Sequence, residues 1–155
     1  MKSPKAKNHL WRTRTYLVGH MQYASGQEWR EYVQDELEKM NVVVYNPYKK
    51  PFVKDVDEDE VARLKTQKNM LDGKFNKVAD RMREIRSFDL NLVDRSDFIV
   101  AHLIPDVASW GSAEELVTAI RMKKPVFLSI EGGKKKTPLW IMGMLPHKYI
   151  YNNVT

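Results

Sequence analysis

The chain has 155 residues and a mass of 18.2 kDa, which is long enough for a single domain to bury a hydrophobic core without disulfides or a structural metal. Its composition, 43% hydrophobic and 30% charged, is typical of a soluble globular protein, and no apolar run is long enough to span a membrane. The absence of cysteine excludes disulfides and thiolate chemistry, and the net charge of +6 raises the question of a polyanionic partner.

The positive charge is concentrated at the amino end of the sequence. Residues 1–14 contain no acidic residue and carry these basic ones: Lys2, Lys5, Lys7, Arg12 and Arg14. Because the remainder is close to neutral, we expect residues 1–14 to form a flexible basic tail, and we do not expect a nucleic-acid partner. The tail lacks the apolar segment of a secretion signal, which favours a cytoplasmic location.

After the tail the chain predicts a strand, a helix and a second strand. Residues 15–19 form an apolar run that ends in glycine, which is typical of a strand. Ser25 and Glu28 have the spacing of a capping box, and the apolar residues that follow recur at helical spacing. Residues 42–45 are β-branched or aromatic and predict a strand that ends before Pro47, because proline cannot continue a ladder of hydrogen bonds.

The middle of the chain predicts more helix. Charge and proline interrupt the pattern after the second strand, and apolar residues at helical spacing over 61–85 then predict one or two helices, with Gly73 as the interruption. Residues 97–103 predict a third strand, residues 112–123 a helix, and residues 125–130 a fourth strand.

The carboxyl-terminal part predicts one more helix and one more strand. Residues 131–136 have the composition of a loop, a short apolar helix begins near Pro138, and residues 149–151 predict the last strand. Strands of continuous apolar character that alternate with helices are typical of a parallel sheet covered on both faces. We therefore predict one α/β domain over residues 15–155, with a parallel sheet of about five strands.

A ligand of such a sheet is expected at the carboxyl ends of the strands. This rule brings Gly19 and His20, Asn46, and the turn at residues 108–115 toward one crevice. Of these segments the turn is the richest in polar side chains.

The turn can be interpreted in two ways. It reads Ser-Trp-Gly-Ser-Ala-Glu-Glu over residues 109–115, and Ser112 and Glu115 have the spacing of a capping box that begins a helix. A turn between a strand and a helix is also where an open α/β sheet binds its ligand. The pattern alone leaves both possibilities open.

Several common motifs are absent from the sequence. Gly19 is not followed by the glycines of a dinucleotide fingerprint, and there is no phosphate-binding lysine loop and no nucleophile-elbow serine. The histidines lack the spacing of metal ligands: His9, His20, His102 and His147. We therefore predict no metal and no cofactor.

Two acidic residues are candidates for chemistry. Asp89 precedes the third strand and is either a solvated carboxylate on a helix or part of a site. Glu115 is either a helix cap or a nucleophile, because the amino end of a helix stabilises a charged carboxylate.

The order of these residues resembles that of the nucleoside 2-deoxyribosyltransferase family. The resemblance covers most of residues 15–130 and is carried by Tyr16–Gly19, Trp29-Arg30, Val44–Pro47, Asp89-Leu90, Ser96–Ala101, Gly111-Ser-x-x-Glu115 and Lys124–Val126. It implies a flavodoxin-like doubly wound sheet, in which residues 48–86 would be a helical elaboration of the family core.

The resemblance also implies a mechanism. Glu115 would attack the anomeric carbon of the sugar and form a glycosyl ester, while Asp89 would help to protonate the departing base. This is the chemistry of two carboxylates in a retaining glycosidase. Transfer to another base or hydrolysis by water would complete the reaction.

Ser109 departs from the transferase pattern, which has an aspartate at this position. In this respect the chain is similar to the nucleoside 5′-monophosphate N-glycosidases, in which a serine and nearby backbone N–H groups receive the phosphate. Ser109, Gly111 and Ser112 at the start of a helix would accept a dianion that an aspartate would repel. A nucleotide substrate is therefore expected.

Other residues have less definite roles. Gly19 and His20 would contact sugar or phosphate. Arg30 either pairs with phosphate or is a charge on the helix surface, and Asn46 either orients the substrate or ends the strand.

The resemblance implies a homodimer or a larger homo-oligomer, in which Trp140 and Met142 belong either to a subunit contact or to the core. Two other functions remain open. One is a nucleotide-binding or sensor module that does not turn over its ligand. The other is a nucleic-acid-associated protein that uses the basic tail and the lysines of residues 134–136.

Overall fold

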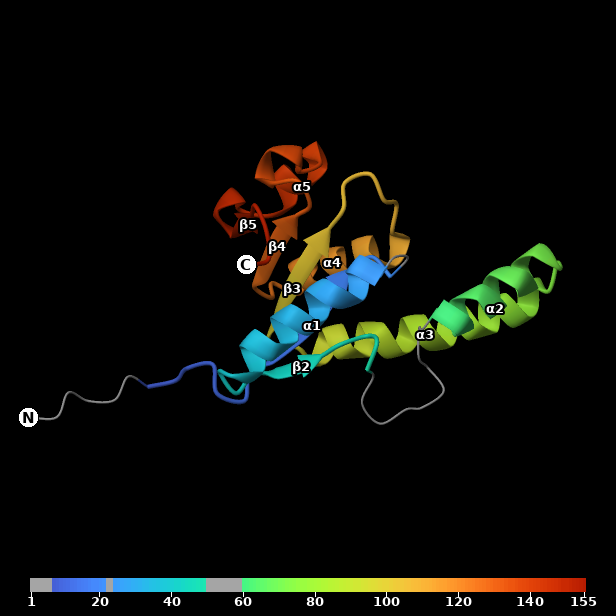
Figure 1. Ribbon diagram of the computed structural model, residues 1–155, viewed down its shortest axis with the longest axis horizontal. Helices are drawn as coiled ribbons and strands as arrows, with labels where there is room; N and C mark the ends of the chain where they lie inside the picture. The colour runs from blue at the N-terminus through green and yellow to red at the C-terminus, as the bar shows by residue number, and fades with distance from the viewer. Residues whose placement is uncertain (1–6, 22–23, 50–59) are drawn as a thin grey trace, which may run out of the picture.

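The computed structural model describes residues 7–21, 24–49 and 60–155 (Figure 1). The elements in chain order are β1 (Arg14–Gly19), α1 (Ala24–Glu38), β2 (Val43–Tyr45), α2 (Glu60–Leu71), α3 (Phe75–Arg95), β3 (Phe98–Leu103), α4 (Trp110–Arg121), β4 (Val126–Ile130), η1 (Lys134–Lys136), α5 (Leu139–Met144), η2 (His147–Tyr149) and β5 (Ile150–Tyr151). All the predicted strands are present. The predicted helical segment is two helices that meet at Gly73, whose φ of 72° suits glycine.

The sheet has five strands in the order β2-β1-β3-β4-β5, and every neighbouring pair is parallel. This confirms the predicted α/β class, and the strand order is that of flavodoxin-like folds. Gly19 at the end of β1 lies beside His102 of β3, which in turn lies beside Ser129 of β4. The carboxyl ends of these strands therefore form one edge of the sheet.

Helices cover both faces of the sheet, and the alternation of side chains along β1 shows which residue faces which layer. Tyr16 and Val18 belong to the larger core cluster, together with residues of α3 and α4. Leu17 belongs to a second cluster with Trp29 and Val33 of α1. Because successive side chains of a strand point to opposite faces, α1 covers one face, and α3 and α4 cover the other (Figure 1).

The glycine that ends β1 is required by the packing of α1. A Cβ atom at Gly19 would lie 2.7 Å from the carbonyl oxygen of His102 and 2.9 Å from a ring carbon of Trp29. Any larger residue would push α1 away from the sheet. The backbone that enters the predicted crevice is thus fixed by packing.

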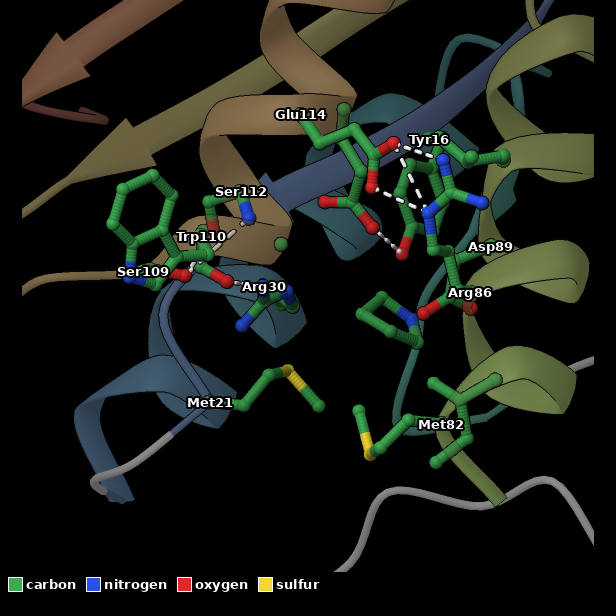
Figure 2. A pocket seen from close by; sticks show the side chains of 16 residues that line it. Tyr16, Met21, Arg30, Met82, Arg86, Asp89, Ser109, Trp110, Ser112 and Glu114 are labelled. Atoms are coloured by element: carbon green, nitrogen blue, oxygen red, sulfur yellow. Dashed lines mark hydrogen bonds and ion pairs between the residues drawn. The ribbon is translucent and has the colours of Figure 1, made fainter. Parts of the chain in front are cut away.

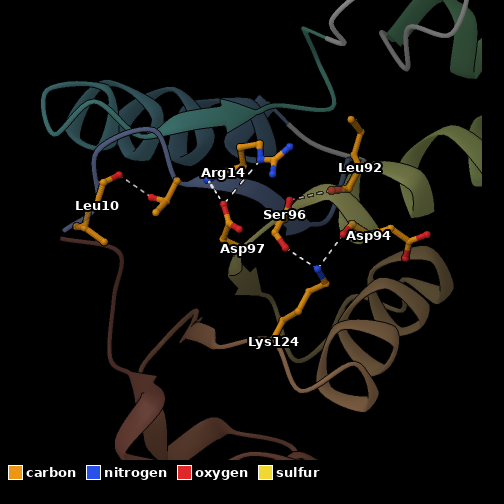
Figure 3. A network of polar contacts seen from close by, with 8 residues as sticks. Leu10, Arg14, Leu92, Asp94, Ser96, Asp97 and Lys124 are labelled. Carbon is orange, nitrogen blue, oxygen red and sulfur yellow. Dashed lines mark hydrogen bonds and ion pairs between the residues drawn. The ribbon is translucent and has the colours of Figure 1, made fainter.

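A network of polar contacts joins the amino ends of β1 and β3 (Figure 3). The Arg14 backbone N–H donates to the Asp97 carboxylate at 2.7 Å, and the Asp97 backbone N–H donates to the Arg14 carbonyl at 2.8 Å. The Lys124 ammonium donates to the carbonyl of Asp94 at 2.8 Å and to that of Ser96. The last carbonyls of a helix have no donor within that helix. Lys124 therefore satisfies carbonyls at the end of α3.

Replacing Lys124 by methionine should lower the free energy of unfolding by about 1 kcal/mol, because the stem stays packed while the charge-assisted hydrogen bonds are lost. Urea unfolding followed by circular dichroism measures the change. Lys135→Met, at an exposed lysine of η1, is the matched control and should be close to neutral. An equal effect of both substitutions would show that the contacts of Lys124 contribute nothing.

The helices α2 and α3 form a hairpin that projects beyond the sheet (Figure 1). The carboxyl-terminal half of α3 packs on the sheet through Leu92 and Val93. In contrast, α2 contains no buried residue and packs on α3. No helix in the described ranges is long and apolar enough to cross a membrane.

Two expectations about the amino-terminal third need comment. The helix α1 begins at Ala24, so Ser25 lies inside its first turn and is not the helix cap that its spacing predicts. The Ser25 hydroxyl lies 3.1 Å from His20 Nε2. In the predicted basic tail, the Arg12 backbone N–H donates to the Asn41 carbonyl at 2.8 Å, while residues 1–6 lie outside the described residues.

Candidate active site

A cavity of about 400 Å³ lies at the carboxyl end of β1, between α3 and the start of α4 (Figure 2). Its wall is formed by β1, α1, the turn after β2, and these two helices. Most of the predicted site residues line this one cavity: Gly19, Arg30, Asp89, Ser109, Gly111, Ser112 and Glu115. The others, His20 and Asn46, do not.

Glu115 is oriented by a residue of the core. The Tyr16 hydroxyl donates a hydrogen bond of 3.0 Å to Glu115 Oε1. Tyr16 is buried among residues of the sheet, so its ring has little freedom and its hydroxyl holds a fixed position. The Glu115 carboxylate is only partly buried and lines the cavity. A partly exposed carboxylate held by a rigid donor is suited to attack a ligand from a constant direction.

Asp89 faces the same cavity from α3. Its side chain is only 6% exposed, which excludes the alternative of a solvated carboxylate on a helix surface. Figure 2 shows Asp89 on the α3 wall, across the cavity from Ser109 and Ser112. Two acidic side chains from separate helices therefore border one space, as chemistry with two carboxylates requires.

The start of α4 corrects the predicted capping box. The cap is Ser109, whose Oγ accepts from the Ser112 backbone N–H at 3.3 Å and donates to Ser112 Oγ at 2.8 Å. The helix thus begins before Ser112, because Ser109-x-x-Ser112 supplies an alternative pair of capping groups. Glu115 lies one turn farther inside the helix, so Ser112 and Glu115 cannot form a capping box.

Gly111, two residues after this cap, leaves space in the wall of the cavity because it has no side chain. Apart from its chain neighbours and the backbone of its own helix, no heavy atom of the described residues lies within 4 Å of the position that a Cβ of Gly111 would occupy. Backbone N–H groups at the amino end of a helix attract anions, and a glycine there lets a ligand approach the backbone. The start of α4 is therefore chemically suited to a phosphate group.

Arg30 is a buried residue and not a charge on the helix surface. It is 1% exposed, and its guanidinium donates to four backbone carbonyl oxygens. These belong to Leu17 at 3.3 Å, Gly19 at 2.7 Å, His20 at 2.9 Å and Gly26 at 2.7 Å. Arg30 therefore joins the end of β1 and His20 to the first turn of α1, beside the cavity.

His20 faces a second cavity, of about 420 Å³, on the α1 side of the sheet. It shares this space with His102, whose Nε2 lies 3.1 Å from the Glu131 carboxylate. Burial lowers the pKa of both histidines, so both rings are neutral at pH 7. No group of three metal-ligating side chains occurs in the described part of the chain.

Asn46 has a structural role in the turn after β2. It is buried, its amide donates to Gln34 Oε1 at 3.0 Å, and its Oδ1 accepts from the Tyr48 backbone N–H at 3.0 Å. These contacts agree with the alternative in which Asn46 ends the strand. Pro47 lines the cavity in its place.

A pair of charges at the rim joins α3 to α4. Arg86 Nε donates to Glu114 Oε2 at 2.8 Å and to Oε1 at 3.0 Å, and a third bond comes from Nη2. Hydrogen bonding from Arg86 lowers the pKa of Glu114, which keeps this carboxylate charged. No sequence pattern linked these two residues, because they lie on different helices.

Residues of α5 are exposed, which excludes the core alternative for Trp140 and Met142. Trp140 is 84% exposed, and Met142 is also exposed. A subunit contact in this region stays a prediction.

Comparisons with known proteins support the fold. No family model matches the sequence, and no curated protein matches it. The structure is similar to that of a 2-deoxyribosyltransferase from the psychrotolerant bacterium Bacillus psychrosaccharolyticus, with a TM-score of 0.60 and 16% sequence identity over 86% of this chain and 82% of that chain. This similarity confirms the flavodoxin-like α/β fold.

Proposed function

We propose that this chain cleaves the N-glycosidic bond of a nucleoside 5′-monophosphate, ribo or deoxy, through a glycosyl ester on Glu115. The observation that carries the proposal is that Glu115 and the buried Asp89 border one cavity at the start of α4. Release to water gives free base and sugar phosphate, and release to a second base gives transfer. No cofactor is needed for either outcome.

The first step forms the ester. A carboxylate oxygen of Glu115 bonds to the anomeric carbon as the bond to the base nitrogen breaks, and the base leaves with that electron pair and takes a proton from Asp89. In the second step water attacks the same carbon. Asp89 accepts a proton from this water, and the Glu115 carboxylate is released.

Tyr16 is a positioning residue in this scheme. Its hydrogen bond to Glu115 Oε1 fixes the orientation of the carboxylate toward the cavity. The same bond stabilises the negative charge that returns to Glu115 when the ester breaks.

Phosphate binding is assigned to the start of α4. The Ser109 hydroxyl and the backbone N–H groups that follow it carry no negative charge, and the helix dipole favours an anion at this end. A nucleotide therefore suits the cavity better than a free nucleoside.

A panel of nucleosides and their 5′-monophosphates tests the function, with free base and sugar phosphate measured by mass spectrometry. We expect base release from at least one monophosphate and a kcat/KM at least about tenfold higher than for the matching nucleoside. Preference for nucleosides would contradict the phosphate assignment. Binding without base release would favour a non-catalytic nucleotide-binding module.

Ser109→Asp should weaken or remove the preference for the phosphate. Aspartate caps a helix as well as serine does, so the fold is retained, but its charge repels the dianion. The ratio of kcat/KM for nucleotide over nucleoside should fall at least about tenfold. Ser109→Asn is the matched control, because it caps without a charge and should keep most of the ratio.

A further inference from the structure

A second cavity, between α2 and α3, adjoins the active-site cavity, and we call it the hairpin groove. The groove has a volume of about 400 Å³. Met21, Met82 and Ile85 line both spaces. Figure 2 shows Met21 and Met82 pointing toward one another at one end of the active-site cavity. Methionine side chains are flexible, so this junction can adapt to a ligand that passes through it.

One face of α3 connects the catalytic end to the groove. Asp89, Ile85, Met82 and Val78 follow one another at helical spacing of three or four residues, which puts them on the same side of the helix. Asp89 and Ile85 are buried, whereas Val78 lies near the start of α3 and lines the groove. A group beside Asp89 therefore lies next to the face of α3 that leads to the hairpin groove.

The opposite wall of the groove is formed by α2. Met70, Ala62 and Thr66 line it, and the Thr66 hydroxyl donates to the Ala62 carbonyl at 3.0 Å. That hydroxyl is occupied within its own helix. Arg63 and Gln67 also line this wall, and Arg81 lines the α3 side, so the groove combines apolar side chains with the stems of longer polar ones.

We propose that the hairpin groove binds an apolar substituent on the base of the substrate. The inference rests on the proposed function, which puts the departing base beside Asp89. A cavity of about 400 Å³ is within the range that holds one small ligand, so a groove of similar size beyond it exceeds the needs of an unmodified base. The preferred substrate is then a nucleotide with a hydrophobic, modified base.

Binding to the Glu115→Gln protein tests this inference without turnover. The probes are N6-benzyl-2′-deoxyadenosine 5′-monophosphate and 5-phenyl-2′-deoxyuridine 5′-monophosphate, each compared with its unsubstituted nucleotide by calorimetry. At least one substituted probe should bind at least about tenfold tighter than its parent. If neither binds tighter than its parent, the groove proposal is overturned.

A charge inside the groove should remove this advantage. Met70→Glu replaces an apolar side chain of the groove by a carboxylate, so the ratio of substituted to parent affinity should fall to near one. Leu71→Glu is the matched control, because Leu71 is 88% exposed on the same helix and does not line the groove. With Leu71→Glu, the ratio of substituted to parent affinity should equal the ratio measured with Leu71 in place.

The remaining outcomes separate the possible failures. A change in molecular mass in solution caused by Met70→Glu and not by Leu71→Glu would show that a second copy fills the groove, and would overturn the proposal. Absence of base release by the unsubstituted protein from any nucleotide would contradict the proposed function. In that case, tighter binding of a substituted probe would still support the groove.

Discussion

Glu115→Gln should abolish base release, with kcat lowered by about 10³-fold or more, in a protein that remains folded. The amide has no negative charge to attack the anomeric carbon, yet it has nearly the same shape. Its oxygen can still accept the hydrogen bond from Tyr16, so the free energy of unfolding should change by no more than about 1 kcal/mol. Single-turnover assays measure the first quantity, and urea unfolding measures the second.

The neighbouring acid is the matched control for this experiment. Glu114 lies on the same helix and at the rim of the same cavity, but its carboxylate is paired with Arg86. Glu114→Gln should therefore retain most of the turnover. Equal loss from both substitutions would show that the charge of this helix turn, and not a nucleophile at Glu115, supports activity. Full activity of Glu115→Gln would refute the mechanism.

Arg30→Met should destabilise the fold by about 3–5 kcal/mol. The guanidinium is buried and donates to four carbonyl oxygens, two of β1, that of His20 and that of Gly26 in α1. Methionine fills part of the space but donates no hydrogen bond, so these oxygens lose the bonds that the guanidinium supplied. Thermal and urea unfolding measure the loss of stability.

Two further substitutions separate the charge from the geometry of Arg30. Arg30→Lys keeps the charge but cannot reach all four oxygens, so it should recover only part of the stability. Arg121→Met removes an exposed arginine at the end of α4 and should change stability by no more than about 0.5 kcal/mol. A loss below about 1 kcal/mol for Arg30→Met would show that water replaces the guanidinium.

The fold was predictable from the sequence because its signals are local. Each strand is a short apolar run, and the glycine at position 73 separates two helices as its conformational freedom suggests. The end of α3 was less predictable. The apolar residues at helical spacing predict a helix only as far as Ile85. In the structure α3 continues to Arg95 and brings Asp89 to the cavity.

The site was predictable only in part, because its remaining contacts join distant segments. Tyr16 and Glu115 are 99 positions apart, and nothing in either segment indicates their hydrogen bond. His20 was expected in the crevice because it follows a strand. The two faces of the sheet, however, are covered by different helices, and His20 lies on the face that α1 covers. Which side a residue after a strand occupies depends on the loop, which the sequence pattern does not define.

The helix α2 contains no buried residue, which affects how the sequence of this protein can evolve. A helix outside the core can accept substitutions at little cost in folding, whereas α4 carries both core residues and Glu115. If α2 selects the base, new substrate preferences can arise by mutation of α2 alone. Natural or engineered variants could then diversify on this helix while the reaction itself stays the same.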